Sequence, residues 1–161
     1  MAIKRLRYFD HQFLIDADFT DEQTYHMDMR RRLNRTLNTF GIGEGLEVVK
    51  KTDKIVTVRA GVAIDNLGRE IILETEQDVN LNAISTAVTA FITIAYGEQP
   101  TDSSGTSSTD GDRRFTEAPI LQAVTAPPPT NGSVVRLASI NLTAGGNVPG
   151  NQRDRRGKPD P

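Results

Sequence analysis

The chain has 161 residues, a length typical of one domain with or without tails. Its 40 Leu, Ile, Val and Phe residues are enough to form a folded core, and 19 basic against 21 acidic residues give a net charge of −2, which argues against a dedicated nucleic-acid-binding protein. The chain has no Cys, which excludes disulfides, thiol nucleophiles and Cys-ligated metal sites.

The first residues do not have the form of a secretory signal. Lys4, Arg5 and Arg7 are not followed by the apolar run that such a signal needs. The longest apolar stretch, residues 88–96, is far shorter than the roughly 20 residues that span a bilayer. We therefore expect no signal peptide and no membrane insertion.

Residues 1–19 alternate aromatic and acidic side chains with neither a helical nor a strand period. This pattern predicts an extended arm with turns. Its aromatic side chains need another surface to cover them, and they are Tyr8, Phe9, Phe13 and Phe19.

A helix is predicted over residues 20–40. Residues 20–23 have the form of a capping box, and Gly41 is placed to end the helix in a left-handed conformation. The apolar residues between them recur at a spacing of three or four and make one narrow stripe, formed by Tyr25, Met29, Leu33, Leu37 and Phe40.

After Gly41 the period of the apolar residues changes to two, which predicts strands. The first four strands form two consecutive hairpins or one meander, and the strand at 88–96 is apolar enough on both faces to be central. The predicted strands cover residues 46–50, 54–60, 62–65, 69–73, 88–96, 120–124 and 134–142.

Two segments are predicted to be flexible. Residues 97–114 form a low-complexity loop that cannot bury apolar surface, and residues 143–161 form a tail rich in Gly, Pro and Arg. The predicted fold class is α+β, mainly β: an N-terminal extended arm and one α-helix, followed by a small antiparallel β-sandwich or barrel-like domain over residues 41–142.

The sequence shows no constellation of catalytic or metal-binding residues. The histidines, His11 and His26, lack metalloprotease spacing, and the acidic stretch 102–112 lacks the spacing of a calcium loop. The glycine-rich run 41–45 follows a helix and precedes a strand, the reverse of the order in phosphate-binding loops. We predict no catalytic residue, cofactor or metal, and no enzymatic activity.

Several segments together resemble a known module. The pattern YFDGQ…EQ.Y…RR..N…GLEV opens proteins of the baseplate and tail-fibre region in contractile phage tails and extracellular contractile injection systems. The matching segments are residues 7–14 (RYFDHQFL), 18–19 (DF), 22–26 (EQTYH), 31–35 (RRLNR), 41–48 (GIGEGLEV), 60–72 (AGVAIDNLGREII), 117–119 (EAP) and 134–140 (VVRLASI).

This resemblance implies a structural particle component, assembled in the bacterial cytoplasm, whose partners are other baseplate or fibre proteins. The chain departs from the pattern at His11, where a glycine is usual, and at Glu44, where a cysteine is common. The first departure affects a turn and the second removes a thiol. Neither touches a known catalytic role.

The arm and the helix stripe predict an assembly interface, because a small chain has too little core to cover them. We expect a homotrimer with the helices near its axis. Two alternatives remain: a receptor- or carbohydrate-binding fibre module, for which only Phe115 lies in the long loop region, and a wall hydrolase, for which no convergent residue set is found. The predicted interface comprises Tyr8, Phe9, Phe13, Phe19, Tyr25, Met29, Leu33, Leu37 and Phe40.

Overall fold

The computed structural model describes residues 3–103, 105 and 111–150. Within these residues one helix precedes eleven strands, and every strand pairing is antiparallel. The elements are α1 (Asp16–Leu37), β1 (Gly41–Gly45), β2 (Val48–Lys50), β3 (Ile55–Val58), β4 (Gly61–Ile64), β5 (Glu70–Leu73), β6 (Gln77–Asn80), β7 (Thr89–Ala95), β8 (Glu98–Ser103), β9 (Asp112–Glu117), β10 (Ile120–Val124) and β11 (Val135–Asn141).

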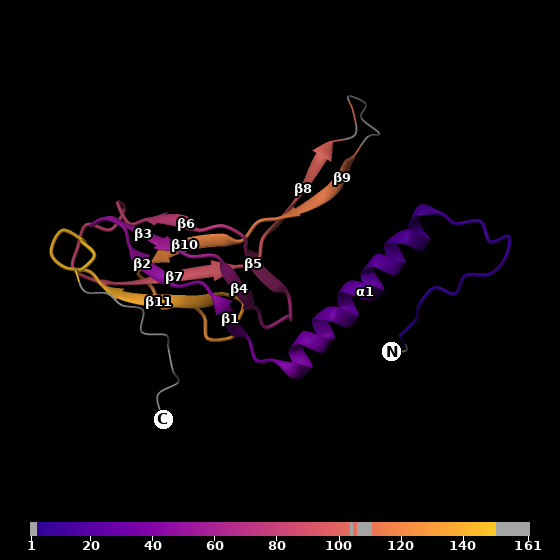
Figure 1. The fold of residues 1–161 in the computed structure, drawn as a ribbon, viewed down its shortest axis with the longest axis horizontal. Coiled ribbons are helices and arrows are strands. Elements are labelled where there is room, and N and C mark those ends of the chain that lie inside the picture. Colours follow the sequence, from indigo (N-terminus) through magenta and orange to yellow (C-terminus); the bar gives the residue numbers. More distant parts are fainter. Residues whose placement is uncertain (1–2, 104, 106–110, 151–161) are drawn as a thin grey trace.

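The strands form three small sheets and one hairpin. The sheets have the orders β1-β4-β5, β10-β7-β11 and β2-β3-β6, and β8 pairs only with β9. Figure 1 shows the three sheets gathered in one β body, from which the β8–β9 hairpin and α1 lead away in different directions. The predicted class, α+β and mainly β, is confirmed.

The hydrophobic core lies wholly in the β body. Its buried apolar side chains run from Leu46 to Val148 and come from all three sheets, and Ile92 and Ile94 on β7 have no exposed surface. The helix contributes no buried residue. The body therefore has a core of its own, and α1 with the arm lies outside it.

The two predicted hairpins are present as β2–β3 and β4–β5, and β7 is central between β10 and β11 as predicted. β1 and β6 were not predicted. β1 consists largely of glycine, and it passes so close to β4 that a Cβ on Gly45 or Gly61 would overlap the neighbouring backbone. β6 is polar apart from Val79, which is its one buried residue.

The predicted start of the helix at residue 20 is wrong. α1 begins at Asp16, and the Ile15 amide donates to Asp18 Oδ2 at 3.0 Å. Thr20 lies inside the helix, where its hydroxyl donates to the carbonyl of Asp16 at 3.0 Å. The carboxylate that satisfies the helix start is therefore Asp18, and acids in this first turn also favour the helix dipole.

The predicted end of the helix at residue 40 is also wrong. α1 ends at Leu37, and Asn38 leaves it in an extended conformation while its amide still donates to the Asn34 carbonyl at 2.9 Å. Gly41 is the first residue of β1, paired with Ile64, and does not cap the helix.

The prediction of a flexible loop over residues 97–114 is wrong at both ends of the segment, where residues 98–103 and 112–114 belong to strands. β8 and β9 form a regular hairpin at both ends of this segment, and residues 104 and 106–110 lie outside the described residues. Cross-strand polar pairs join the strands: the hydroxyls of Thr101 and Thr116 lie 2.9 Å apart, and Arg114 Nη1 lies 2.5 Å from Asp102 Oδ2. Such pairs replace the apolar contacts that the sequence lacks.

The predicted flexible tail is ordered over its first residues. Thr143 bridges to Asn147, and the buried Val148 donates its amide to the Asp53 carbonyl at 2.9 Å. Lys50 Nζ donates to the Val148 carbonyl at 2.6 Å. Residues 151–161 lie outside the described residues.

The described part of the chain has no helix with the length and apolar character needed to cross a membrane.

Candidate assembly interface

The predicted interface residues lie on the arm, on α1 and on the short link to β1, and none of them belongs to the core. Tyr25 and Met29 are half-buried. The other seven are exposed, and Phe13 at 88% and Leu37 at 70% are the two most exposed of them; the remaining five are Tyr8, Phe9, Phe19, Leu33 and Phe40. The structure therefore leaves a long apolar surface outside the folded body.

α1 docks on the β body through polar contacts near its C-terminal end. Arg30 Nε lies 3.0 Å from Glu70 Oε1, and Asn34 Nδ2 donates to the Gly68 carbonyl at 3.0 Å. Arg35 Nη1 donates to the Leu67 carbonyl, also at 3.0 Å. The helix is thus held by the turn between β4 and β5.

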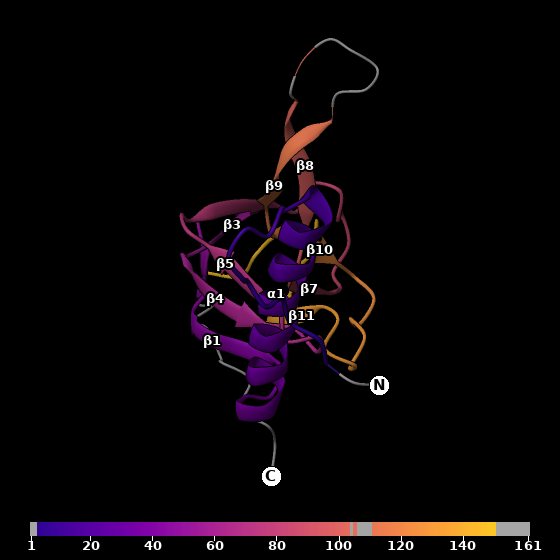
Figure 2. The ribbon, with the colours of Figure 1, turned by 90° about the vertical axis from the view of Figure 1, so that its right-hand side faces the viewer.

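The apolar stripe runs beside the docking residues of α1. Successive residues of a helix are rotated by about 100°, so Leu33 lies roughly 100° around the axis from Asn34 and roughly 60° from Arg30. Met29 lies farther from the docking residues, whereas Leu37 lies within about 20° of Arg30, on one face of the helix but two turns along it. Figure 2 shows α1 standing in front of the β body.

Asp65 holds the docking turn in shape. Its buried carboxylate accepts the amides of Leu67 and Arg69 at 2.9 Å each, and Arg69 Nε at 2.6 Å. In the sequence, Asp65 is only the last residue of the predicted strand 62–65. An Asp three residues before a Gly is a recognisable turn signal, but its burial and ion pair come from the folded body.

Phe40 makes a second anchor between the helix and the body. Its ring lies against Gly132, where a Cβ would overlap the ring atoms. The Gly132 carbonyl accepts the Asn66 amide at 3.0 Å, which ties this loop to the docking turn. Phe40 is therefore an internal contact in part, while 49% of its surface remains exposed.

The arm turns back along the first half of α1. A tight turn forms where the Gln12 amide donates to the Phe9 carbonyl at 3.2 Å, with His11 at a φ of +67°. The Tyr8 hydroxyl donates to Glu22, and this bond raises the pKa of Tyr8. Between the arm and the helix remains a space of about 430 Å³, so the arm is loosely packed there.

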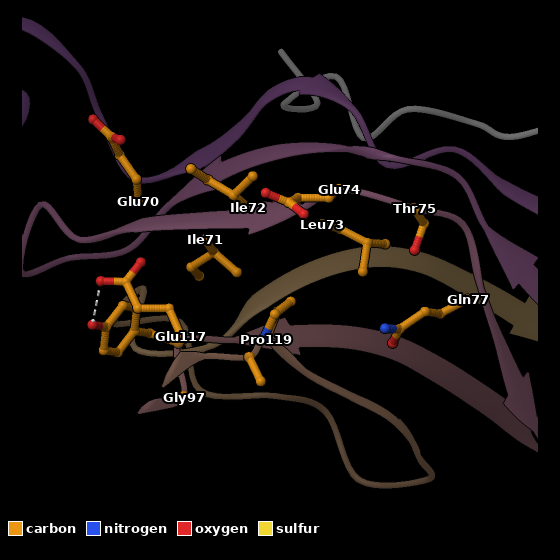
Figure 3. Close-up of a pocket in the computed structure, with 12 residues that line it drawn as sticks. Glu70, Ile71, Ile72, Leu73, Glu74, Thr75, Gln77, Gly97, Glu117 and Pro119 are labelled. Carbon is orange, nitrogen blue, oxygen red and sulfur yellow. Dashed lines mark hydrogen bonds between the residues drawn. The ribbon is translucent and has the colours of Figure 1, made fainter. Parts of the chain in front are cut away.

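A groove of about 290 Å³ lies beside β5 (Figure 3). Ile72 and Glu74 lie on one wall, and Glu117 and Pro119 on the other. Tyr96, also in the lining, donates its hydroxyl toward Glu98 at 2.7 Å and Glu117 at 2.9 Å. Burial is the main cause that raises the pKa of Tyr96, and the two carboxylates add to it.

The described residues contain no group of three or more His, Asp or Glu side chains that could hold a metal ion. His26 Nε2 lies 3.9 Å from Glu22 Oε1, one helical turn away.

Gly68→Ala is expected to loosen the helix from the body. Gly68 has a φ of +77°, and a Cβ there would overlap the carbonyl oxygen of Arg31. We expect a loss of roughly 1–3 kcal/mol in the free energy of unfolding, and faster amide hydrogen exchange in the last turns of α1. Gly111→Ala is the matched control, because nothing lies within 4 Å of a Cβ there, and it should leave both measurements unchanged.

The docking of α1 is expected to weaken in acid. Partial burial acts to raise the pKa of Glu70, but its bonds from Arg30 and Asn34 outweigh burial and hold that pKa below its ordinary value. The ionised Glu70 carboxylate therefore stabilises the folded chain fully above the unfolded-state pKa of about 4.3. This stabilisation is lost as the pH falls through the lower pKa of Glu70 in the folded chain. Thermal melts should show Glu70→Gln less stable than wild type at neutral pH and equal to it in strong acid. A difference independent of pH would contradict this assignment.

No protein-family model and no curated protein matches the chain. Among solved structures, a chain of the type VI secretion system TssK-TssF-TssG baseplate subcomplex, determined by cryo-electron microscopy, matches with a TM-score of 0.59 and 15% sequence identity. The match covers 98% of this chain and 62% of that one. At this identity the likeness shows a shared fold, which extends over the arm and helix as well as the β body.

Proposed function

We propose that the chain is a structural component of a contractile phage tail or contractile injection particle, where it attaches a fibre to the baseplate or completes the baseplate. The observation that carries this proposal is the apolar surface of the arm and α1, which lies outside the core along its whole length. Monomeric proteins rarely expose continuous apolar surface of this kind, and it marks protein–protein contacts.

Two further findings support the proposal. The fold is similar to that of a chain in a type VI secretion system baseplate subcomplex. The sequence segments that resemble baseplate and tail-fibre proteins include the arm and helix. Both lines favour a partner-binding role for this part of the chain.

The partner that we propose for the helix is two further copies of the same chain. α1 has 22 residues and is about 33 Å long, and its stripe repeats every four residues from Tyr25 through Met29 and Leu33 to Leu37. Three such helices packed around an axis bury the stripe, while the docking residues of each helix remain in contact with the β body of the same chain.

The location of the protein tests the particle assignment. Particles purified from cells that make this chain should carry it at the baseplate end, seen by immunogold electron microscopy with an antibody against the β body. Deletion of its gene should give tails without fibres or with incomplete baseplates. Particles that lack the protein, and intact particles in the deletion strain, would contradict the proposal.

The proposed role involves no catalysis. Incubation of the full chain with purified peptidoglycan should release no soluble fragments at concentrations where a wall hydrolase releases them. Release that disappears on mutation of a carboxylate would show that the chain is an enzyme.

A receptor-binding fibre module is the second candidate. Phe115 favours it, because this side chain is 70% exposed on β9 in a hairpin that projects from the body (Figure 1). If the hairpin contacts a receptor, Phe115→Ala should lower particle adsorption to host cells without changing particle assembly.

A further inference from the structure

The groove beside β5 follows an unpaired sheet edge. β5 is the last strand of the sheet β1-β4-β5. One edge of β5 pairs with β4, and no strand of the sheet pairs with its other edge. Six consecutive residues, 70–75, line the groove, which places it along the other edge (Figure 3). In an antiparallel ladder, facing residue pairs that exchange hydrogen bonds alternate with pairs that do not. The Asp65 amide donates to the Arg69 carbonyl, so Arg69 and Ile71 direct their backbone groups toward β4. The backbone groups of Glu70 and Ile72 therefore face the free edge.

The lining of the groove combines apolar and acidic side chains. Ile72, 43% exposed, and Pro119 give it apolar walls. Glu70, Glu74 and Glu117 also line it, and no Lys or Arg is among the lining residues. The groove therefore suits an extended segment that offers backbone hydrogen bonds together with positive charge.

The first described residues of the arm have these properties. Residues 3–7 read Ile-Lys-Arg-Leu-Arg, with three cations and no acid. They belong to no strand, and only Leu6 among them is half-buried. The space of about 430 Å³ between the arm and α1 is lined by Arg5, Leu6 and Arg7, so their own helix does not hold them tightly.

We propose that residues 3–7 of one copy pair as an added strand with the free edge of β5 in a second copy. Main-chain hydrogen bonds to Glu70 and Ile72 align the added strand, and its cations lie close to Glu74 and Glu117. The inference rests on the proposed homo-oligomer. In that assembly the arm contacts the β5 edge of another copy, whereas the helix stripe contacts the stripes of the other helices.

Engineered cysteines test this contact directly, because the chain has none of its own. Arg5 is the centre of the arm segment and Ile72 the centre of the edge, so they lie opposite each other whichever way the strand runs. Facing residues of neighbouring strands have Cα atoms about 4.5–5.5 Å apart, within the roughly 4.4–6.8 Å that a disulfide needs.

Full-length Arg5→Cys, carrying a size tag, is mixed with untagged Ile72→Cys, and subunits are exchanged before mild oxidation. We expect a disulfide-linked heterodimer on a denaturing gel, in at least about tenfold higher yield than from Arg5→Cys mixed with Thr52→Cys, because docking raises the effective concentration of the two thiols. Thr52 is an exposed residue in the β2–β3 turn, away from the groove. Glu74→Lys, added to the Ile72→Cys copy, should lower the yield severalfold.

Light scattering of the same mixtures separates the two proposals. Oligomers that give no heterodimer above the Thr52→Cys control would overturn the arm–groove contact and leave the proposed assembly standing. Monomers would overturn both. A disulfide that forms only within one chain, when Arg5→Cys and Ile72→Cys are combined in the same copy, would also overturn the exchange between copies.

Discussion

Asp65→Ala is expected to remove a large part of the stability of the β body, roughly 2–4 kcal/mol of the free energy of unfolding. The side chain of Asp65 has no exposed surface and satisfies two backbone amides as well as the Arg69 guanidinium. Alanine leaves these donors without an acceptor. Arg69 also lies 4.5 Å from the centre of the Tyr96 ring, so its release loosens that contact too.

Urea denaturation followed by circular dichroism measures this loss. Asp53→Ala is the matched control, since Asp53 also pairs with a basic side chain, Lys50 at 2.6 Å, but is 69% exposed. The control should unfold at nearly the wild-type midpoint. Equal midpoints for Asp65→Ala and Asp53→Ala would show that the docking turn does not depend on the buried carboxylate.

Leu33→Asp is expected to abolish self-assembly and to leave the folded monomer almost unchanged. Leu33 is 56% exposed on the apolar stripe, so an aspartate there meets water in a free chain. In the assembled helices the same carboxylate is buried without a partner, which costs several kcal/mol per copy. Substitutions at exposed positions usually change monomer stability by no more than about 0.5 kcal/mol.

The solution mass and the melting temperature of a diluted sample distinguish these effects. Thr24→Asp introduces the same charge at an exposed position on the opposite side of α1 and should assemble as wild type. If Leu33→Asp retains the wild-type mass, the stripe is not the contact between copies. If it unfolds at low concentration, Leu33 stabilises the monomer itself.

Much of the β body was predictable because its strands carry local signals. The short apolar run of β3, the alternation in β5 and the turn before Arg69 are features of short segments, and the sequence places their hairpins correctly. β6 and the β8–β9 hairpin lack these signals, since their strands are polar and their pairing is set by cross-strand contacts.

The helix was predictable in kind and less so at its ends. Two capping patterns compete near its start, and the sequence favours Thr20 although the chain uses Asp18. At the other end, Gly41 resembles a helix cap, but its pairing with Ile64 in β1 decides its role. The error at the start is a choice between two local patterns, and the error at the end arises because a tertiary contact overrides a local one.

The apolar residues of the candidate interface were found from spacing alone, but the residues that position α1 were not. Arg30 and Asn34 look like ordinary polar positions of a helix, and Gly68 like an ordinary turn glycine. Their role depends on contacts between segments more than 30 residues apart, which no local pattern records.

The mass of the full chain in solution tests the central claim most directly. Multi-angle light scattering during gel filtration, at micromolar concentration, should give three times the chain mass of 17.7 kDa. A mass of one chain across the concentration range would contradict the account, because the apolar surface of the arm and α1 would then be stable in water without a second copy.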